Sequence, residues 1–536
     1  MRLIAVLFAT VALLSAQADR IEGERIRPHV KFLASDLLEG RGPGARGGLL
    51  AEEYLAAQFA AAGLQPAGDN GGFIQQVPLQ LVEAISSNAR LTIVGLDATV
   101  ELRWLDDFVA TTHRRQPALD FEAATVFVGH GIRAPEYAWD DYQGVDVKGK
   151  VVVLFTGEPP SDDPRFFAGK ALTYYGRWTY KYEEAARQGA LGAIIIHTTP
   201  TASYGWQVVR GQGRPMPQAD PSPGTPALAL AGWITSQSGE KLLGSSGLTL
   251  AGALAAADQR GFHARPLSTK LRLKMDFHIA PLDTGNVIGM VPGSDPRWKN
   301  EAVIFTAHWD HLGIGPPVNG DSIYNGAVDN ATGSAMLIEM ARAWASLDPK
   351  PKRSAYFASV TAEESGLLGS RYLAQHPPVP AGRIAADLNF DSFSPLGRTR
   401  DAGFSGAERT TLWDLVQKTA QEFGLTIKGD THPDAGGYYR SDHFSFARTG
   451  VPAFSIGMGS EYPDLPASIA AAKMKEFGAR YHQPSDEYSP DWNFSGIEQF
   501  ARLGFTLGLR IANLDRLPTW RAGDEFLPAR EQAGVR

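Results

Sequence analysis

The stretch "SAYFASVTAEESG", residues 354–366, joins a run typical of a buried β-strand to two adjacent carboxylates. "SAYFASV" is a short apolar run of the kind that lies in the middle of a sheet. Glu363 and Glu364 follow it, and two neighbouring carboxylates resist ionising together, the more so when they are partly buried. Their position at the end of a core strand predicts either a positive partner or a separate task for each glutamate.

The rest of the chain from about residue 284 repeats a rhythm of strand, loop and helix. Short apolar strands are predicted within residues 286–293, 301–311, 383–392 and 451–459, with amphipathic helices between them. This alternation indicates an α/β fold with a mostly parallel central sheet and helices on both faces. In such sheets, ligands bind at the carboxyl ends of the strands.

The chain is 536 residues long, which favours two or three domains. The strand-rich segment with "KVVVLFTG" and "LGAIIIHT" predicts an inserted, smaller, β-rich α/β domain over residues 116–268. None of its histidines, at 130, 197 and 263, stands near an acidic cluster at ligand spacing, so the insert is predicted to be non-catalytic. The other predicted parts are a first segment 19–115, a catalytic segment 269–520 and a tail 521–536.

The glycine-rich stretch "EGRGPGARGG", residues 39–48, contains a formal G-x-G-x-x-G pattern. It follows a predicted helix rather than a strand, whereas a dinucleotide site needs the strand first. We therefore expect a flexible loop here.

The first residues have the composition of a secretory signal. Arg2 precedes an apolar run at residues 3–14, and "AQA" at 16–18 supplies small residues before a cleavage point, so residues 1–18 are a predicted signal peptide. No later segment is apolar enough to predict a membrane span. The chain lacks cysteine, which excludes disulfides and thiolate ligands and, in an exported protein, favours a bacterial periplasmic or secreted one. The net charge of -7 argues against nucleic acid as a partner.

Polar side chains gather at the predicted carboxyl ends of the strands. His308 and Asp310 end one strand, Asp391 ends another, Asp329 precedes a helix, and His482 comes late in the chain. Taken singly, each has an ordinary structural explanation: a hydrogen-bonded core histidine, a turn cap, a helix N-cap or a surface-loop histidine. Their shared place on one edge of one sheet favours a common site.

Histidines and carboxylates without cysteine suit zinc best, with manganese or cobalt as possible substitutes. Two histidines and three carboxylates exceed what one tetrahedral zinc needs. They suit two metals about 3.5–4 Å apart with one carboxylate bridging them.

The motifs that carry these residues resemble those of a known family. They are "TAHWDH" (306–311), "YNGAVDNATGSA" (324–335), "TAEESGLLGS" (361–370), "LNFDS" (388–392) and "YHQPSDE" (481–487), with "LASDLLEGRGPGARGG" (33–48) near the start. The chain is similar to the di-zinc exopeptidases that include secreted bacterial aminopeptidases, glutamate carboxypeptidase and the transferrin receptor. The insert resembles the protease-associated domain found in these enzymes.

The resemblance implies a role for each site residue. His308, Asp329 and Asp391 would hold one zinc, and Asp329, Glu364 and His482 the other, with Asp329 bridging. Glu363 would be the general base and acid. Asp310 would orient the ring of His308, Tyr481 would donate a hydrogen bond to the developing oxyanion, and Arg440 would contact substrate.

These roles imply an exported, zinc-dependent aminopeptidase that removes N-terminal residues from peptides through a water held by two metals. A carboxypeptidase, or another peptide or amide hydrolase on the same scaffold, remains an alternative. A single-zinc glutaminyl cyclase is disfavoured by the five expected ligands. A non-catalytic binding protein, similar to the transferrin receptor, is disfavoured because every expected ligand is present.

Overall fold

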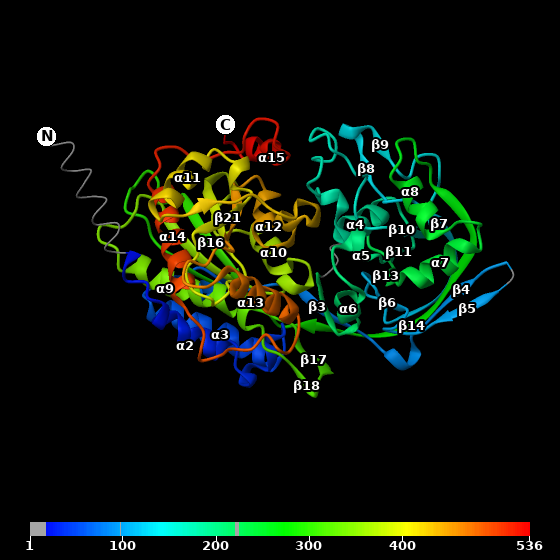
Figure 1. Cartoon of the computed structure of the whole chain (residues 1–536), viewed down its shortest axis with the longest axis horizontal. Coiled ribbons are helices and arrows are strands. Elements are labelled where there is room, and N and C mark those ends of the chain that lie inside the picture. Colours follow the sequence, from blue (N-terminus) through cyan, green and yellow to red (C-terminus); the bar gives the residue numbers. More distant parts are fainter. Residues whose placement is uncertain (1–17, 97, 220–223, 536) are drawn as a thin grey trace. The chain divides into compact units, whose positions relative to one another are not determined.

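The computed structural model describes residues 18–96, 98–219 and 224–535, and the predicted signal peptide lies, except for Ala18, outside them. The chain forms two compact units, which we describe separately (Figure 1). The first unit comprises the described residues up to Val77, Asp283–Asp430 and the residues from Arg440 onward. The second comprises Pro78–Leu282 and Thr431–Tyr439.

The first unit is built on a sheet whose centre is parallel. Strands β19 (Ser354–Val360), β16 (Ala302–His308), β20 (Ile384–Phe390) and β23 (Ala453–Met458) run parallel in that order. The parallel centre predicted from the sequence is therefore confirmed. The flanking strands β15 (Gly285–Val291) and β21 (Asp401–Ser405) pair antiparallel with it, so the sheet is mixed.

Short strands complete the edges of this unit. β1 (Gln65–Pro66) and β2 (Ile74–Gln76) pair with β15, and β22 (Thr426–Ile427) pairs with β21. β17 (Gly313–Val318) and β18 (Asp321–Tyr324) form a separate hairpin.

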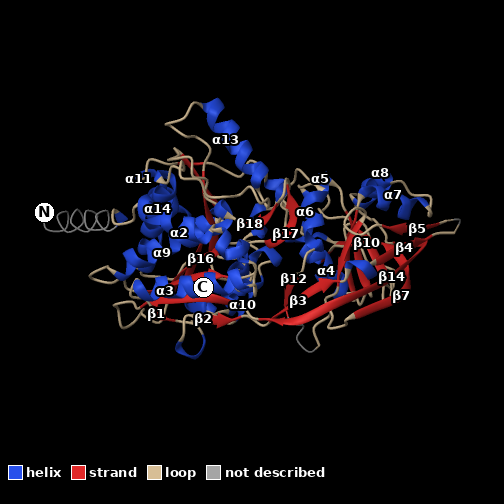
Figure 2. Cartoon of the chain, turned by 90° about the horizontal axis from the view of Figure 1, so that it is seen from below, coloured by secondary structure: helices blue, strands red, loops and turns tan. Residues whose placement is uncertain are grey.

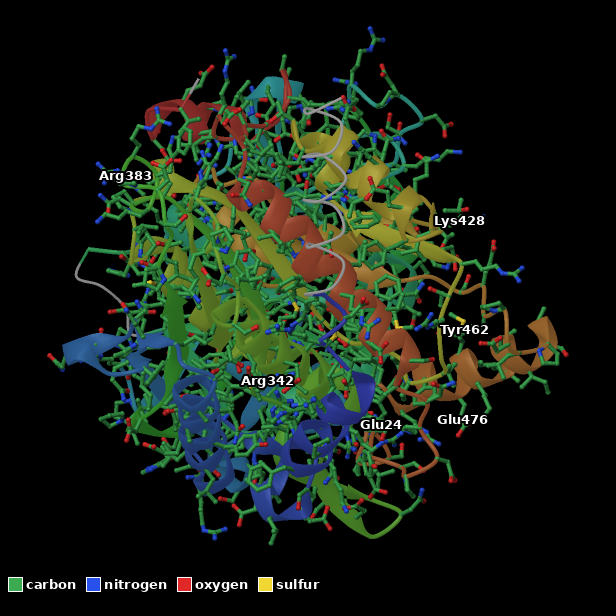
Figure 3. The ribbon with its side chains drawn as sticks, turned by 90° about the vertical axis from the view of Figure 1, so that its left-hand side faces the viewer. Glu24, Arg342, Arg383, Lys428, Tyr462 and Glu476 are labelled. Carbon is green, nitrogen blue, oxygen red and sulfur yellow. The ribbon has the colours of Figure 1, made fainter. Side chains whose placement is uncertain are left out.

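Helices cover both faces of the sheet, as predicted (Figure 1). On one face, Phe305 of β16 stacks on Phe357 of β19 with ring centroids 4.8 Å apart, and Trp344 packs edge-on against both rings. The helices on this side are α2 (Gly23–Leu33), α3 (Arg46–Ala61), α9 (Thr332–Ala345) and α14 (Ser495–Ala512). Glu24 and Arg342 mark α2 and α9 in Figure 3. The opposite face carries α10 (Leu368–Gln375) and α12 (His443–Ala447), which contact each other.

Helix α13 (Ala467–Arg480) differs from the other helices of this unit. Of its residues, all of them described, Ala470 alone is buried. The helix stands away from the sheet, and Glu476 lies on its exposed side (Figures 2 and 3). Its last residue is followed directly by Tyr481 and His482.

The C-terminal segment belongs to the first unit rather than forming a loose tail. Helix α15 (Leu527–Gln532) lies here, and Trp520, Phe526 and Arg530 are buried. Helix α11 (Trp413–Glu422), earlier in the chain, contacts α14. The predicted tail 521–536 is thus packed, because Arg530 donates hydrogen bonds to the carbonyls of Pro518, Ala381 and Ile384.

The second unit is a ten-stranded sheet with helices. Its long strand β14 (Arg265–Leu282) pairs antiparallel with β7 (Ala118–Phe127), β4 (Arg90–Val94) and β3 (Leu79–Ala84). Because β14 continues past residue 268 and pairs with β3 and β4, the compact unit is wider than the predicted insert 116–268.

The remaining elements of the second unit are short. They are β5 (Thr99–Leu102), β6 (Phe108–Thr111), β8 (Arg133–Ala134), β9 (Trp139–Asp140), β10 (Val151–Leu154), β11 (Gly192–Ile196), β12 (Met216–Ala219), β13 (Leu230–Ile234), α4 (Trp178–Arg187), α5 (Thr199–Ala202), α6 (Trp206–Arg210), α7 (Ser236–Gly244) and α8 (Leu250–Ala257). Across the described ranges of both units, no helix combines the length and apolar character needed to cross a membrane.

Candidate metal centre

Two histidines and three carboxylates predicted as ligands meet at the carboxyl end of the parallel strands. His308 is the last residue of β16, and Asp391 follows the neighbouring strand β20. Nε2 of His308 lies 3.4 Å from Oδ1 of Asp391 and 3.2 Å from Oδ1 of Asp329. These three residues form the first of two donor groups.

The second group shares Asp329 with the first. Nε2 of His482 lies 3.4 Å from Oδ2 of Asp329 and 3.0 Å from Oε2 of Glu364. Asp329 therefore presents one oxygen to each histidine, as a bridging ligand would. The five residues predicted as ligands are all brought together.

This arrangement fits metal ions. Donor atoms about 2.0–2.1 Å from a tetrahedral zinc lie about 3.3 Å apart, and the four distances above range from 3.0 to 3.4 Å. Among the described residues, Nε2 of His482 is a buried atom without a hydrogen bond. Buried polar atoms are normally satisfied, so this atom indicates a missing ligand. The residues that would hold the ions are His308, Asp329 and Asp391 for one, and Asp329, Glu364 and His482 for the other.

The site is strongly acidic, and its charges shift the titration of its members. Burial alone would raise the pKa of Glu364, but His482 and His311 hold it well below its ordinary value. Burial alone would lower the pKa of His482, but Glu364 and Asp329 raise it to about 10. Cations are therefore favoured at this edge of the sheet.

Glu363 has a different environment from its neighbour. Both glutamates lie in a 3₁₀ turn, Glu363–Ser365, which is separated from the end of β19 by two residues and brings two successive side chains to the same edge of the sheet. Burial of its carboxyl group, together with the negative charges of Glu364 and Asp391, raises the pKa of Glu363 well above its ordinary value despite the opposing effect of His308. The two adjacent carboxylates therefore differ in their pKa, which is raised for Glu363 and lowered for Glu364.

Asp310 is buried beside this turn. Its Oδ1 accepts a hydrogen bond from the backbone N–H of Glu363 at 3.1 Å and lies 3.7 Å from Nδ1 of His308. Nδ1 of His308 lies closer, at 3.1 Å, to the carbonyl oxygen of Asp310. Asp310 therefore contacts His308 with its backbone and fixes the turn of Glu363 with its carboxylate.

Tyr481 contacts a predicted ligand directly, whereas Arg440 is the chain neighbour of a residue that does. The ring of Tyr481 stacks on that of His482 with centroids 3.8 Å apart, and 54% of the tyrosine is exposed. Arg440 ends a short 3₁₀ helix, Gly437–Arg440, next to Ser441. The Ser441 hydroxyl donates a hydrogen bond to Oδ2 of Asp391 at 2.6 Å.

Two residues of the site lie inside the quoted motifs but receive no role from sequence alone. Asp486 of "YHQPSDE" accepts hydrogen bonds from the backbone N–H groups of Val328 and Asp329, and so holds the turn that carries Asp329. His311 of "TAHWDH" lies with Nδ1 2.7 Å from Oε1 of Glu364. The signal that could have identified them is the same as for His308 and His482, namely a titratable side chain within a motif at a strand end.

Arg41 was also missed, because its segment was predicted to be a flexible loop. That prediction is wrong: the segment enters a 3₁₀ turn, Asp36–Arg41, and Arg41 is fully buried. Its guanidinium donates hydrogen bonds to four carbonyl oxygens, those of Leu33 (2.5 Å), Trp309 (2.7 Å), Asn325 (2.5 Å) and Gly326 (2.8 Å). Arg41 therefore ties the loop after His308 to the loop before Asp329.

Comparison with known proteins finds a peptidase family and relatives named as an aminopeptidase and a leupeptin-inactivating enzyme. Residues 286–503 match the profile described as Peptidase family M28. Leupeptin-inactivating enzyme 1 of Streptomyces exfoliatus is 27% identical over 205 residues, which cover 38% of this chain and 42% of that protein. An aminopeptidase of Pseudomonas aeruginosa is 28% identical over 201 residues, 36% of this chain and 34% of that protein. The matched segments thus span less than half the length of these relatives.

Among solved structures, an aminopeptidase from Aneurinibacillus sp. strain AM-1 has the same fold. Its TM-score is 0.53 at 20% identity, and the alignment covers 95% of this chain and 98% of that one.

Proposed function

We propose, from the premise that residues 286–503 belong to peptidase family M28, that the protein is a zinc-dependent aminopeptidase acting on peptides. The observation that carries the proposal is the pair of donor groups that share Asp329, with the raised pKa of Glu363 beside them. The protein would hold two zinc ions, with manganese or cobalt as possible substitutes.

The chain's own residues supply the proton transfers. The ions, when bound, provide Lewis acidity toward the scissile carbonyl and toward water. Glu363 accepts the proton of the attacking water and delivers it to the leaving amine as the C–N bond breaks. The phenol of Tyr481 donates to the developing oxyanion, and Asp310 keeps the turn of Glu363 in place.

The direction of cleavage follows from charge. A free N-terminus is a cation, and the site offers Asp329, Asp391 and both adjacent glutamates to receive it. Acetylation of the substrate's N-terminus is therefore expected to abolish cleavage, which paired aminoacyl and N-acetyl-aminoacyl substrates measure directly with the zinc-loaded protein. Equal rates on both substrates would contradict the aminopeptidase proposal.

A carboxypeptidase is the second candidate, because Arg440 precedes Ser441, which contacts Asp391. A guanidinium at this place would bind the terminal carboxylate of a substrate. Cleavage of N-blocked peptides that is lost when the C-terminus is amidated would favour this candidate.

We also propose that the protein is exported, on the strength of Arg2, the apolar run 3–14 and "AQA" at 16–18. N-terminal sequencing of protein from its native host is expected to begin at or near Asp19. Full-length protein that starts at Met1 and stays in the cytosol would contradict export.

The second unit contributes to neither donor group, since the residues of both lie in the first unit. We propose that this unit, which resembles a protease-associated domain, acts on substrate selection rather than on metal chemistry.

A further inference from the structure

His311 is a buried histidine at the metal centre that the proposed function does not use. Its side chain is 0% exposed, and its backbone N–H donates to the carbonyl oxygen of Arg41 at 3.4 Å. Its ring lies edge-on to that of His482, with centroids 5.7 Å apart. Within the described ranges, neither ring nitrogen of His311 makes a hydrogen bond, and the ring has one ion-pair contact, with Glu364.

The contact with Glu364 is direct. Nδ1 of His311 lies 2.7 Å from Oε1 of Glu364, whereas the other oxygen, Oε2, lies 3.0 Å from Nε2 of His482. Two donors of one tetrahedral zinc lie about 3.3 Å apart, so 2.7 Å is too short for an ion shared by His311 and Oε1. It is the distance of a charge-assisted contact between the two side chains themselves.

We propose that His311 is a positioning residue that holds Oε1 of Glu364 and so presents Oε2 to the ion that His482 and Asp329 also bind. This inference rests on the proposed function, because it takes Glu364 to be a metal ligand. Partners behind a ligand fix its orientation, and their loss typically weakens metal binding by about 10–100-fold. Without the contact to His311, the side chain of Glu364 would be free to change rotamer. Each binding event would then cost the entropy of ordering it, which lowers the affinity for the ion.

The test compares two substitutions at this position. His311→Leu removes the contact, whereas His311→Asn places an amide donor near the position of Nδ1. Zinc stoichiometry by elemental analysis and zinc affinity by chelator competition are measured for both variants and wild type. His197→Leu, which removes a buried histidine of the second unit that contacts the carbonyl of Tyr204, is the matched control.

We expect His311→Leu to weaken the binding of one of the two ions by about 10–100-fold and to leave the other unchanged. His311→Asn and the His197 control are expected to stay near wild type. Equal losses in both His311 variants would overturn the inference and make His311 a ligand itself. Unchanged affinity in both would also overturn it while leaving the proposed function intact, whereas a wild-type protein that binds no zinc would overturn both.

Discussion

Glu363→Gln is expected to lower turnover by about 10²–10⁴-fold while both zinc ions stay bound. The substitution keeps the size and polarity of the side chain but removes the proton acceptor. The backbone N–H of residue 363 still donates a hydrogen bond to Asp310, so the turn that follows β19 is retained. Turnover and elemental analysis on the same preparation measure the two effects separately.

Glu364→Gln is the matched variant one residue later. It is expected to weaken zinc binding, whereas Glu363→Gln is expected to leave both ions bound. It removes a negative charge that lies 3.0 Å from His482 and 2.7 Å from His311, so the affinity for one zinc should fall. Excess zinc should then restore part of the rate. If Glu363→Gln lost zinc and Glu364→Gln kept both ions, the two roles would be exchanged; if neither changed turnover, the assignment of the site would fail.

Arg41→Leu is expected to destabilise the first unit by about 3 kcal/mol or more, because each unsatisfied buried polar group costs about 1–3 kcal/mol. The carbonyls of Leu33, Trp309, Asn325 and Gly326 would all lose the hydrogen bond from Arg41, and among the described residues only that of Gly326 would keep a second one, from the backbone N–H of Ala331. Urea unfolding of the metal-free protein, followed by a probe in the first unit, measures the change.

Arg46→Leu is the control for this prediction, since Arg46 stands in the same segment but its side chain is 71% exposed. Its ion pair with Glu39 is expected to contribute at most about 1 kcal/mol. Equal stability of the Arg41 and Arg46 variants would show that the four hydrogen bonds contribute little.

The meeting of the five predicted ligands was predictable because strand ends are visible in a sequence. Apolar runs that stop at His308 and Asp391 locate two neighbouring carboxyl ends, and parallel strands place these ends at one edge of the sheet. The parallel centre follows from the same alternation of strand and helix. The antiparallel strands β15 and β21 carry the same apolar signal as the parallel ones, so pattern alone does not separate them.

The residues that were missed act on groups far away in the sequence. Arg41 contacts backbone carbonyls near residues 309 and 326, and backbone acceptors carry no signal in the side-chain pattern. Asp486 likewise binds backbone N–H groups of the turn at Asp329. The wider bounds of the second unit were missed because β14 continues without a turn signal to Leu282.

The division of the chain also sets the order in which the protein can be completed during synthesis. The polypeptide passes from one unit to the other after Val77, Leu282, Asp430 and Tyr439. Strands β1 and β2 pair with β15. More than two hundred further residues must therefore be synthesised before the partner strand of this N-terminal segment leaves the ribosome. Domains generally fold as units during synthesis, N-terminal first. Here the N-terminal unit is the one that finishes last, because His482 and α14 are still to come when the second unit receives its final segment at Tyr439.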